Sequence, residues 1–151
     1  QPWGHVPEVG LGKLFGKLLG GKPAVDYKSL QIDNSASLGP AGRVHATLAD
    51  WAKFVLLVAD PRGGKRLGIN DQDWQRLTAA SAEDGTYAGG WVLLQRDWAG
   101  GRALFHNGSN TTWYSVAWVA PERGLCLLAA TNAYSPKAES GCDAAVTLLL
   151  P

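Results

Sequence analysis

The residues best suited to chemistry are five consecutive ones, His106, Asn107, Gly108, Ser109 and Asn110. A histidine there offers a group that gains or loses a proton near neutral pH. A glycine lets a ligand approach the backbone closely, and the N–H of the next residue can then point at a substrate oxygen. The two asparagines add neutral hydrogen-bonding groups. By spacing alone, a polar hairpin loop with a histidine at the strand end fits the pattern better than a site.

The other candidate residues have structural interpretations. We expect His5, which follows a glycine, in a turn or a packing contact, and His45 beside a helix cap. Asp50 belongs to the first turn of a helix, where a carboxylate is favourable. No cluster of His, Cys or Asp has the spacing of metal ligands, so we expect no metal and no cofactor. The apolar surroundings of Cys126 and Cys142 favour two buried thiols over a disulfide.

Beyond residue 87 the apolar residues follow a period of two, which predicts strands. We expect four of them, joined by short connections into an antiparallel meander, at residues 87–95, 103–107, 113–120 and 125–131. The candidate site then lies where the second strand ends. The third strand carries apolar side chains on both faces, so the sheet needs cover on both sides.

Residues 47–79 and 135–150 are expected to contain helices. Thr47 is a suitable N-cap for a helix with an apolar stripe, and a shorter helix should begin after Asn70. Ser135 caps the last helix and is followed by a proline, which suits the first helical position. The fold class is therefore α+β, with helices flanking the sheet and a C-terminal helix.

Residues 1–46 are rich in Gly, Pro and Ser and are expected to be a mostly irregular covering segment. Within it, residues 11–19 carry a helical stripe of Leu11, Leu14, Phe15, Leu18 and Leu19. A helix or loop closing over an apolar face of the same domain is the favoured interpretation, because the neighbouring glycines weaken an isolated helix. The alternative is a basic amphipathic helix on a membrane surface.

Composition places the chain among ordinary globular domains. Its 151 residues suit one domain, residues 1–151, and the net charge of +1 gives no electrostatic case for a nucleic-acid partner. No run of eighteen apolar residues occurs, so we expect no integral membrane segment. The polar, proline-containing start does not resemble a signal peptide, and nothing else in the sequence indicates a compartment.

Five stretches, in order along the chain, resemble the serine β-lactamase and penicillin-binding-protein-like hydrolase superfamily. They are QPWGH at residues 1–5, GPAGRVHATLADWAKF at 39–54, YAGGW at 87–91, HNGSNTTWY at 106–114 and LAATN at 128–132. The fourth resembles a His-x-Gly version of that family's Lys-Thr-Gly motif. The resemblance implies a partial β-lactamase-like α/β domain, the C-terminal half of an acyl-serine hydrolase. Many relatives of this kind are exported in bacteria.

The same resemblance assigns roles to the candidate residues. His106 matches the basic residue of the motif, Gly108 its glycine, and the N–H of Ser109 the second oxyanion-hole donor, so these three are the expected catalytic residues. Asn107 stands where the family has threonine, and with Asn110 it is expected to bind substrate. Histidine in place of lysine is typical of the esterase-like or D-aminopeptidase-like branch and argues against penicillin-type substrates.

The family's nucleophile lies in a Ser-x-x-Lys motif and its second active-site element in a Tyr-x-Asn motif. Neither occurs among these 151 residues. We therefore expect a hydrolase part that is inactive alone and acts on an acyl substrate only when completed. The alternative is a non-catalytic binding or assembly module built on the same half of the fold. Either way, we expect residues 125–131 to be an edge strand that is completed by self-association, by a partner chain, or by a swap in which residues 1–46 fill the gap. Self-association is the favoured outcome, because it needs nothing beyond this sequence.

Overall fold

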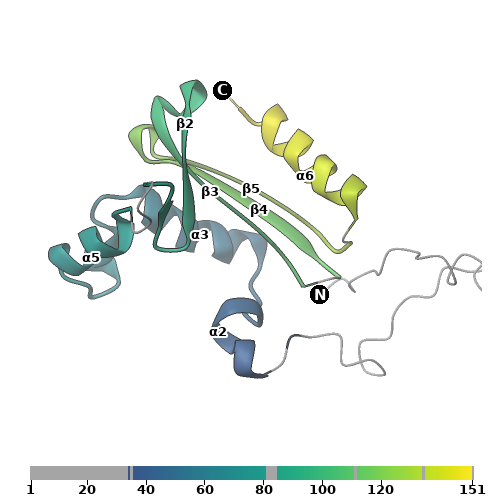
Figure 1. Ribbon diagram of the computed structural model, residues 1–151, viewed down its shortest axis with the longest axis horizontal. Coiled ribbons are helices and arrows are strands. Elements are labelled where there is room, and N and C mark those ends of the chain that lie inside the picture. The colour runs from purple at the N-terminus through teal and green to yellow at the C-terminus, as the bar shows by residue number, and fades with distance from the viewer. Residues whose placement is uncertain (1–33, 35, 81–84, 111, 134, 151) are drawn as a thin grey trace, which may run out of the picture.

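One antiparallel sheet forms the centre of the protein. The computed structural model describes residue 34 and residues 36–80, 85–110, 112–133 and 135–150. Its strands are β1 (Tyr87–Ala88), β2 (Trp91–Arg96), β3 (Gly101–Ser109), β4 (Tyr114–Ala120) and β5 (Leu125–Thr131). Each strand is antiparallel to the next, in the order β1-β2-β3-β4-β5 (Figure 1). The expected α+β class and antiparallel meander are confirmed.

The described sheet has five strands, so the expectation of four was wrong. The segment expected to be one strand, residues 87–95, is divided by Gly89 and Gly90, whose φ angles are 52° and 92°. Two successive residues with positive φ make the two-residue hairpin turn that suits the twist of paired strands. Ala88 therefore pairs with Trp91, and the chain reverses. Alternation of side chains continues on both sides of such a turn and does not reveal it.

Strand β3 extends further than expected. It ends at Ser109 and not at Asn107, because Gly108 and Ser109 pair with Ser115 and Tyr114 of β4. The candidate residues 106–109 therefore lie within a paired strand, and the expected loop at residues 108–112 begins only after Ser109. This correction matters for the site, because a strand fixes the direction of each backbone N–H and each side chain.

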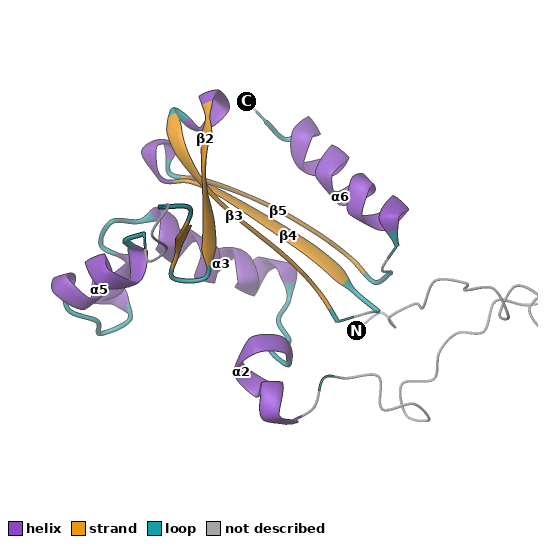
Figure 2. Ribbon diagram, in the orientation of Figure 1, coloured by secondary structure: helices purple, strands orange, loops and turns teal. Residues whose placement is uncertain are grey.

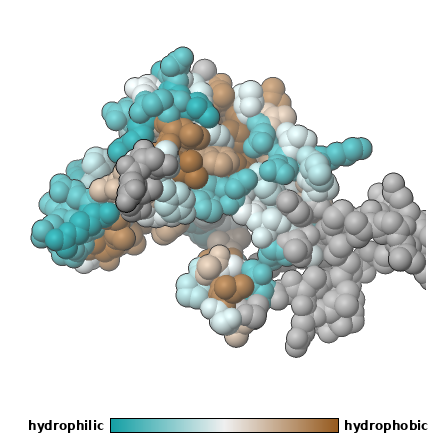
Figure 3. Space-filling model, in the orientation of Figure 1, coloured by the Kyte–Doolittle hydropathy of each residue, from teal (hydrophilic) through white to brown (hydrophobic). Residues whose placement is uncertain are grey.

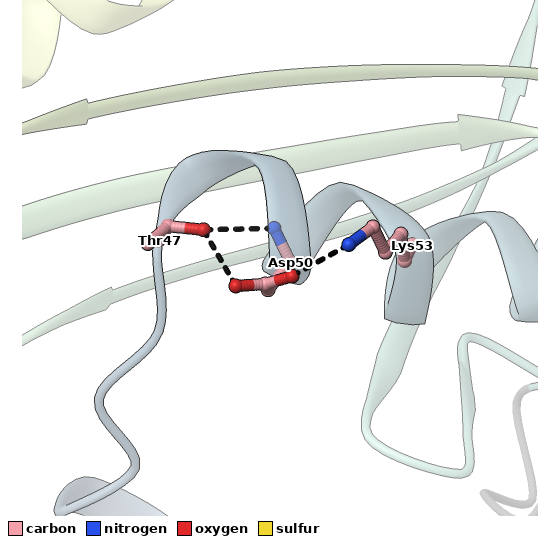
Figure 4. Close-up of polar contacts among 3 residues, drawn as sticks. All are labelled: Thr47, Asp50 and Lys53. Atoms are coloured by element: carbon pink, nitrogen blue, oxygen red, sulfur yellow. Dashed lines mark hydrogen bonds and ion pairs between the residues drawn. The ribbon is translucent and has the colours of Figure 1, made fainter.

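Helix α3 (Leu48–Ala59) begins where the sequence predicted, at its N-cap Thr47. The hydroxyl of Thr47 accepts a hydrogen bond from the Asp50 N–H at 3.1 Å and donates one to the Asp50 carboxylate at 2.8 Å (Figure 4). Lys53 donates to the same carboxylate at 2.7 Å. The hydrogen bonds from Lys53 and then from Thr47 lower the pKa of Asp50. Local side-chain chemistry thus sets the start of this helix.

The predicted start of a helix after Asn70 and the predicted cap Ser135 are confirmed. The Asn70 side chain accepts from the Asp73 N–H at 2.9 Å at the start of α5 (Asp71–Thr78). Ser135 accepts from the Ala138 N–H at 3.1 Å at the start of α6 (Pro136–Leu148).

The remaining helical elements are short turns that the sequence did not predict individually. They are η1 (Ala36–Leu38), α2 (Gly39–Gly42), α4 (Gly63–Arg66), η2 (Asp97–Ala99) and η3 (Pro121–Arg123). The predicted stripe at residues 11–19 lies outside the described residues. Within the described part of the chain, no helix combines the length and the apolar character needed to cross a bilayer.

Helices cover both faces of the sheet, as its two-sided apolar pattern predicted. On one face, Val55 and Ala59 of α3 pack with Leu104 and Val119. On the other face, residues of α6 and of the strands form a second cluster: Cys142, Val146, Tyr114, Val116 and Leu127. Figure 2 shows α3 and α6 on opposite sides of the strands.

The two cysteines are separated by the sheet. Cys126 packs in the cluster beneath α3 and Cys142 in the cluster beneath α6. Both are free thiols, which confirms the prediction against a disulfide. Burial raises the pKa of each thiol, so both stay protonated at neutral pH.

Candidate functional site

Residues 106–109 are four exposed positions in the last part of β3. Because side chains alternate along a strand, His106 and Gly108 lie on the face covered by α3, whereas Asn107 and Ser109 lie on the face covered by α6. The structure therefore brings the four predicted residues together on one strand but divides their side chains between two faces. His106 is not part of the core.

The backbone of Ser109 points toward the β2 side of β3. The Leu93 N–H donates to the Thr86 carbonyl at 2.7 Å, so Leu93 directs its backbone groups toward β1. Successive residues of an antiparallel strand direct their N–H and C=O groups to opposite neighbouring strands. Leu93 lies opposite Leu104, so Leu104 directs its backbone groups toward β4, and Asn107 and Ser109 direct theirs away from β4. The pairing of β2 with β3 covers residues 101–105 of β3. Along residues 107–109, β3 is paired with β4 in the described sheet.

Asn107 is engaged with a buried tyrosine. Its Nδ2 donates to the hydroxyl of Tyr114 at 3.1 Å, across the β3–β4 pair. Burial raises the pKa of Tyr114; the hydrogen bond from Asn107 opposes this rise, and Asp143 and Glu139 of α6 add to it. The phenol is therefore neutral at ordinary pH. The side chain expected to bind substrate thus also ties β3 to the core beneath α6.

Asn110 organises the turn that follows β3. Its side-chain oxygen accepts from the N–H of Trp113 at 3.1 Å and from the hydroxyl of Thr112 at 3.1 Å. An asparagine that bonds backbone a few residues ahead is a common way to close a loop. The role in substrate binding expected for Asn110 stays a prediction, and its carboxamide oxygen already has partners within the loop.

Among the described residues, nothing requires glycine at position 108. A Cβ built there meets no atom within 4 Å, and its φ lies outside the left-handed region. Gly89 differs, since it has a φ of 52° and a Cβ there would collide with the Leu77 carbonyl. Glycine in a strand interior weakens the strand and often marks a close approach by a ligand or another chain. Gly108 is thus the position where the described structure leaves room.

A separate hollow of about 440 Å³ lies on the outward side of α3, and His106 is not among the residues that line it. Its lining residues are Lys53, Phe54, Leu56, Leu57 and Arg66. Figure 3 shows other hydrophobic atoms at the surface, for example on the small lobe that contains α2. Among the described residues, no three side chains of His, Cys, Asp or Glu are grouped closely enough to hold a metal ion.

A family model described as Beta-lactamase matches residues 4–150. The chain belongs to the β-lactamase family. Comparison with curated proteins finds no match, and comparison with solved structures finds none. The match spans every helix and strand described above and confirms the family resemblance that the sequence motifs carried.

Membership of the β-lactamase family gives this chain a hydrolase-type fold, within which β3 carries the His-x-Gly segment. Sequence reasoning missed two features of this arrangement. One is Tyr114 as the partner of Asn107. The register of the β3–β4 hairpin makes these two positions diagonal neighbours, so a predicted register would have revealed the pair. The other is the hollow on α3, which the apolar residues on both sides of that helix indicate.

Proposed function

We propose that this β-lactamase-family chain forms the β3 wall of an acyl-serine hydrolase site for ester or amide substrates. In this proposal the N–H of Ser109 stabilises the negative charge on the substrate oxygen, and His106 supplies the titratable side chain of the wall. The nucleophile comes from a Ser-x-x-Lys segment, which the 151 residues do not contain. The esterase-like or peptidase-like class follows from histidine at the position of the family's lysine.

The observation that carries the proposal is Gly108. Nothing in the described structure requires a glycine there, and the residue lies between His106 and Ser109 on an exposed part of the strand. An acyl group bound along β3 would explain the missing side chain, because the carbonyl oxygen of that group must come within hydrogen-bonding range of the strand's N–H. The direction of the Ser109 backbone, away from β4, supports the same arrangement.

The alternative, a non-catalytic binding or assembly module, is favoured by one observation. Without Ser-x-x-Lys and Tyr-x-Asn, the 151 residues alone offer binding and oxyanion stabilisation but no attacking group. The two candidates differ in whether a serine that reacts with acyl-type inhibitors ever lies next to β3.

The first test uses the purified 151-residue chain with a fluorophosphonate probe, nitrocefin and p-nitrophenyl butyrate. We expect neither a stoichiometric adduct nor turnover. The second test determines the mass of the native complex from the source cells and labels that complex with the fluorophosphonate. We expect the label on a serine outside this chain's sequence.

Variants connect that label to β3. Gly108→Val places a branched side chain where the acyl group would lie, and we expect labelling of the complex to slow by about 10²-fold. Gly141→Ala is the matched control, since it also adds a side chain in open space but on α6. An adduct on a serine of the isolated chain, or labelling that Gly108→Val leaves unchanged, contradicts the proposal. A native species that consists of this chain alone and stays unlabelled supports the module instead.

A further inference from the structure

The outward side of α3 is an unusually apolar surface. Its inward side packs against the sheet through Val55 and Ala59, as a surface helix normally does. On the outward side, however, Phe54 is 55% exposed and Leu56 is 46% exposed, beside the hollow of about 440 Å³. A helix that is apolar all round is normally covered on both sides. Contiguous apolar surface of this kind marks an interaction site.

The charges around the hollow are already paired within the chain. Lys53 lies 2.7 Å from Asp50, and Arg66 lies 3.4 Å from Asp60. A charged partner would gain little from cations that keep their own carboxylates. Most of the lining is apolar, namely Phe54, Leu56 and Leu57, so apolar contact is what an occupant gains there.

A segment of this chain has the required apolar face and the required reach. Residues 11–19 carry five apolar side chains at helical spacing, with Lys13 and Lys17 off the stripe. Residue 34 is tied to α2, the helical element that directly precedes α3, because the Asn34 side chain donates to the Gly42 carbonyl at 2.8 Å. The fourteen residues 20–33 span up to about 45 Å, and α3 is about 18 Å long.

We propose that residues 11–19 of this chain cover the outward side of α3 and fill the hollow beside Phe54. The stripe supplies leucine and phenylalanine side chains to a surface made mostly of the same residue types. Attachment to the same chain raises the local concentration of the segment into the millimolar range, so a modest apolar contact is enough to hold it. The inference is independent of the hydrolase proposal.

Photo-cross-linking tests the contact in the full chain. Phe54 is replaced by the photoreactive residue p-benzoylphenylalanine, a modest change at an exposed aromatic position. After irradiation, cleavage before aspartate releases residues 1–25 and 50–59 as separate fragments. We expect these two fragments to be joined, with a yield that does not depend on protein concentration. The joined product identifies the occupant directly.

Two pairs of substitutions separate the stripe from the rest of the segment. The pair Leu14→Gln and Leu18→Gln should reduce the joined product at least tenfold. The pair Lys13→Gln and Lys17→Gln should leave it unchanged. A photoreactive residue at Leu148, which is 85% exposed on α6, should not join residues 1–25.

Three results would overturn the inference. They are cross-linking of position 54 to a second copy with a yield that rises with concentration, cross-linking to a different segment, and no cross-linking at all. The cross-link is measured first in the chain whose residues 11–19 are unchanged, so the test does not depend on the folding of the glutamine variants.

Discussion

At the scale of single residues, some glycines of the described part of the chain are required by the fold and others are not. A Cβ at Gly63 would collide with the Leu57 carbonyl, and one at Gly64 would collide with the Trp74 side chain. Gly89 adds a positive φ to a similar collision. These glycines are required by the fold. Gly108 is not, because a Cβ there would meet open space among the described residues and its φ is ordinary. The effect of a substitution at Gly108 on the free energy of unfolding therefore tests why this residue is glycine.

We expect Gly108→Ala to raise the free energy of unfolding by about 0.4–1 kcal/mol, because alanine fits the backbone and has less freedom in the unfolded chain. Gly89→Ala, the control, should lower it by more than about 1 kcal/mol. Urea denaturation of both variants and of the parent chain measures the two effects. If Gly108→Ala destabilises the protein, a neighbour within the chain occupies that space and the argument for a ligand there is lost.

At the scale of elements, α3 owes its start to a local network and its position to the sheet. Thr47, Asp50 and Lys53 are all exposed, and their hydrogen bonds involve neighbours three residues apart. The inward stripe then packs on the sheet, mainly on β4 and β5, through the cluster that includes Val55 and Val119. The network decides where the helix begins, and the core decides how it is oriented.

Thr47→Ala should lower the free energy of unfolding by about 1 kcal/mol at pH 7, the usual effect of losing an N-cap. Because the folded-state pKa of Asp50 is lowered partly by Thr47, that carboxylate stabilises the fold above its unfolded pKa and ceases to do so as the pH falls through the folded value. The difference between parent and variant should therefore shrink in acid. Thermal unfolding between pH 7 and pH 3 measures it.

Ser140→Ala is the control for the cap. It removes a hydroxyl that bonds back to the Pro136 carbonyl within the interior of α6, where no cap is lost. We expect little change in stability and no pH dependence. An equal loss in both variants would mean that the hydroxyl of Thr47 does not act as a cap.

At the scale of the whole molecule, the described sheet ends at β5. All seven residues of β5 pair with β4, and β5 is the last strand in the order. Alternation of the backbone groups, followed from the Leu93–Thr86 bond, places the N–H of Ala130 on the side away from β4. A strand in that position can pair with another chain, and the sequence predicted self-association or a partner there.

We expect the purified chain to self-associate through β5, so that its mass by light scattering rises with concentration. Ala130→Pro removes the outward N–H and keeps the bonds to β4, which is how proline is tolerated on an edge strand. It should leave a monomer across the whole series, whereas Ala130→Ser should still associate. A parent chain that is monomeric at every concentration would refute pairing between copies at this edge.

The features that the sequence itself determined depend on neighbours in the chain. Thr47, Asn70 and Ser135 each bond an N–H three residues ahead. Residue type and position were therefore enough to predict the caps Thr47 and Ser135 and the start of a helix after Asn70. The period-two pattern was enough for the sheet, and the His-x-Gly segment was enough to place the candidate site on β3. The reversal at Gly89 and Gly90 was missed, although paired glycines are themselves a turn signal.

The tertiary structure alone decided the features that depend on register and on distant contacts. The pairing of Ser109 with Tyr114 extends β3 through the site, turns the Ser109 N–H away from β4 and places His106 and Asn107 on opposite faces. The bond from Asn107 to Tyr114 exists only because that register makes them diagonal neighbours. Which helix covers which face is likewise a matter of packing between segments far apart in sequence, because the local pattern specifies that a face is apolar but not what lies against it.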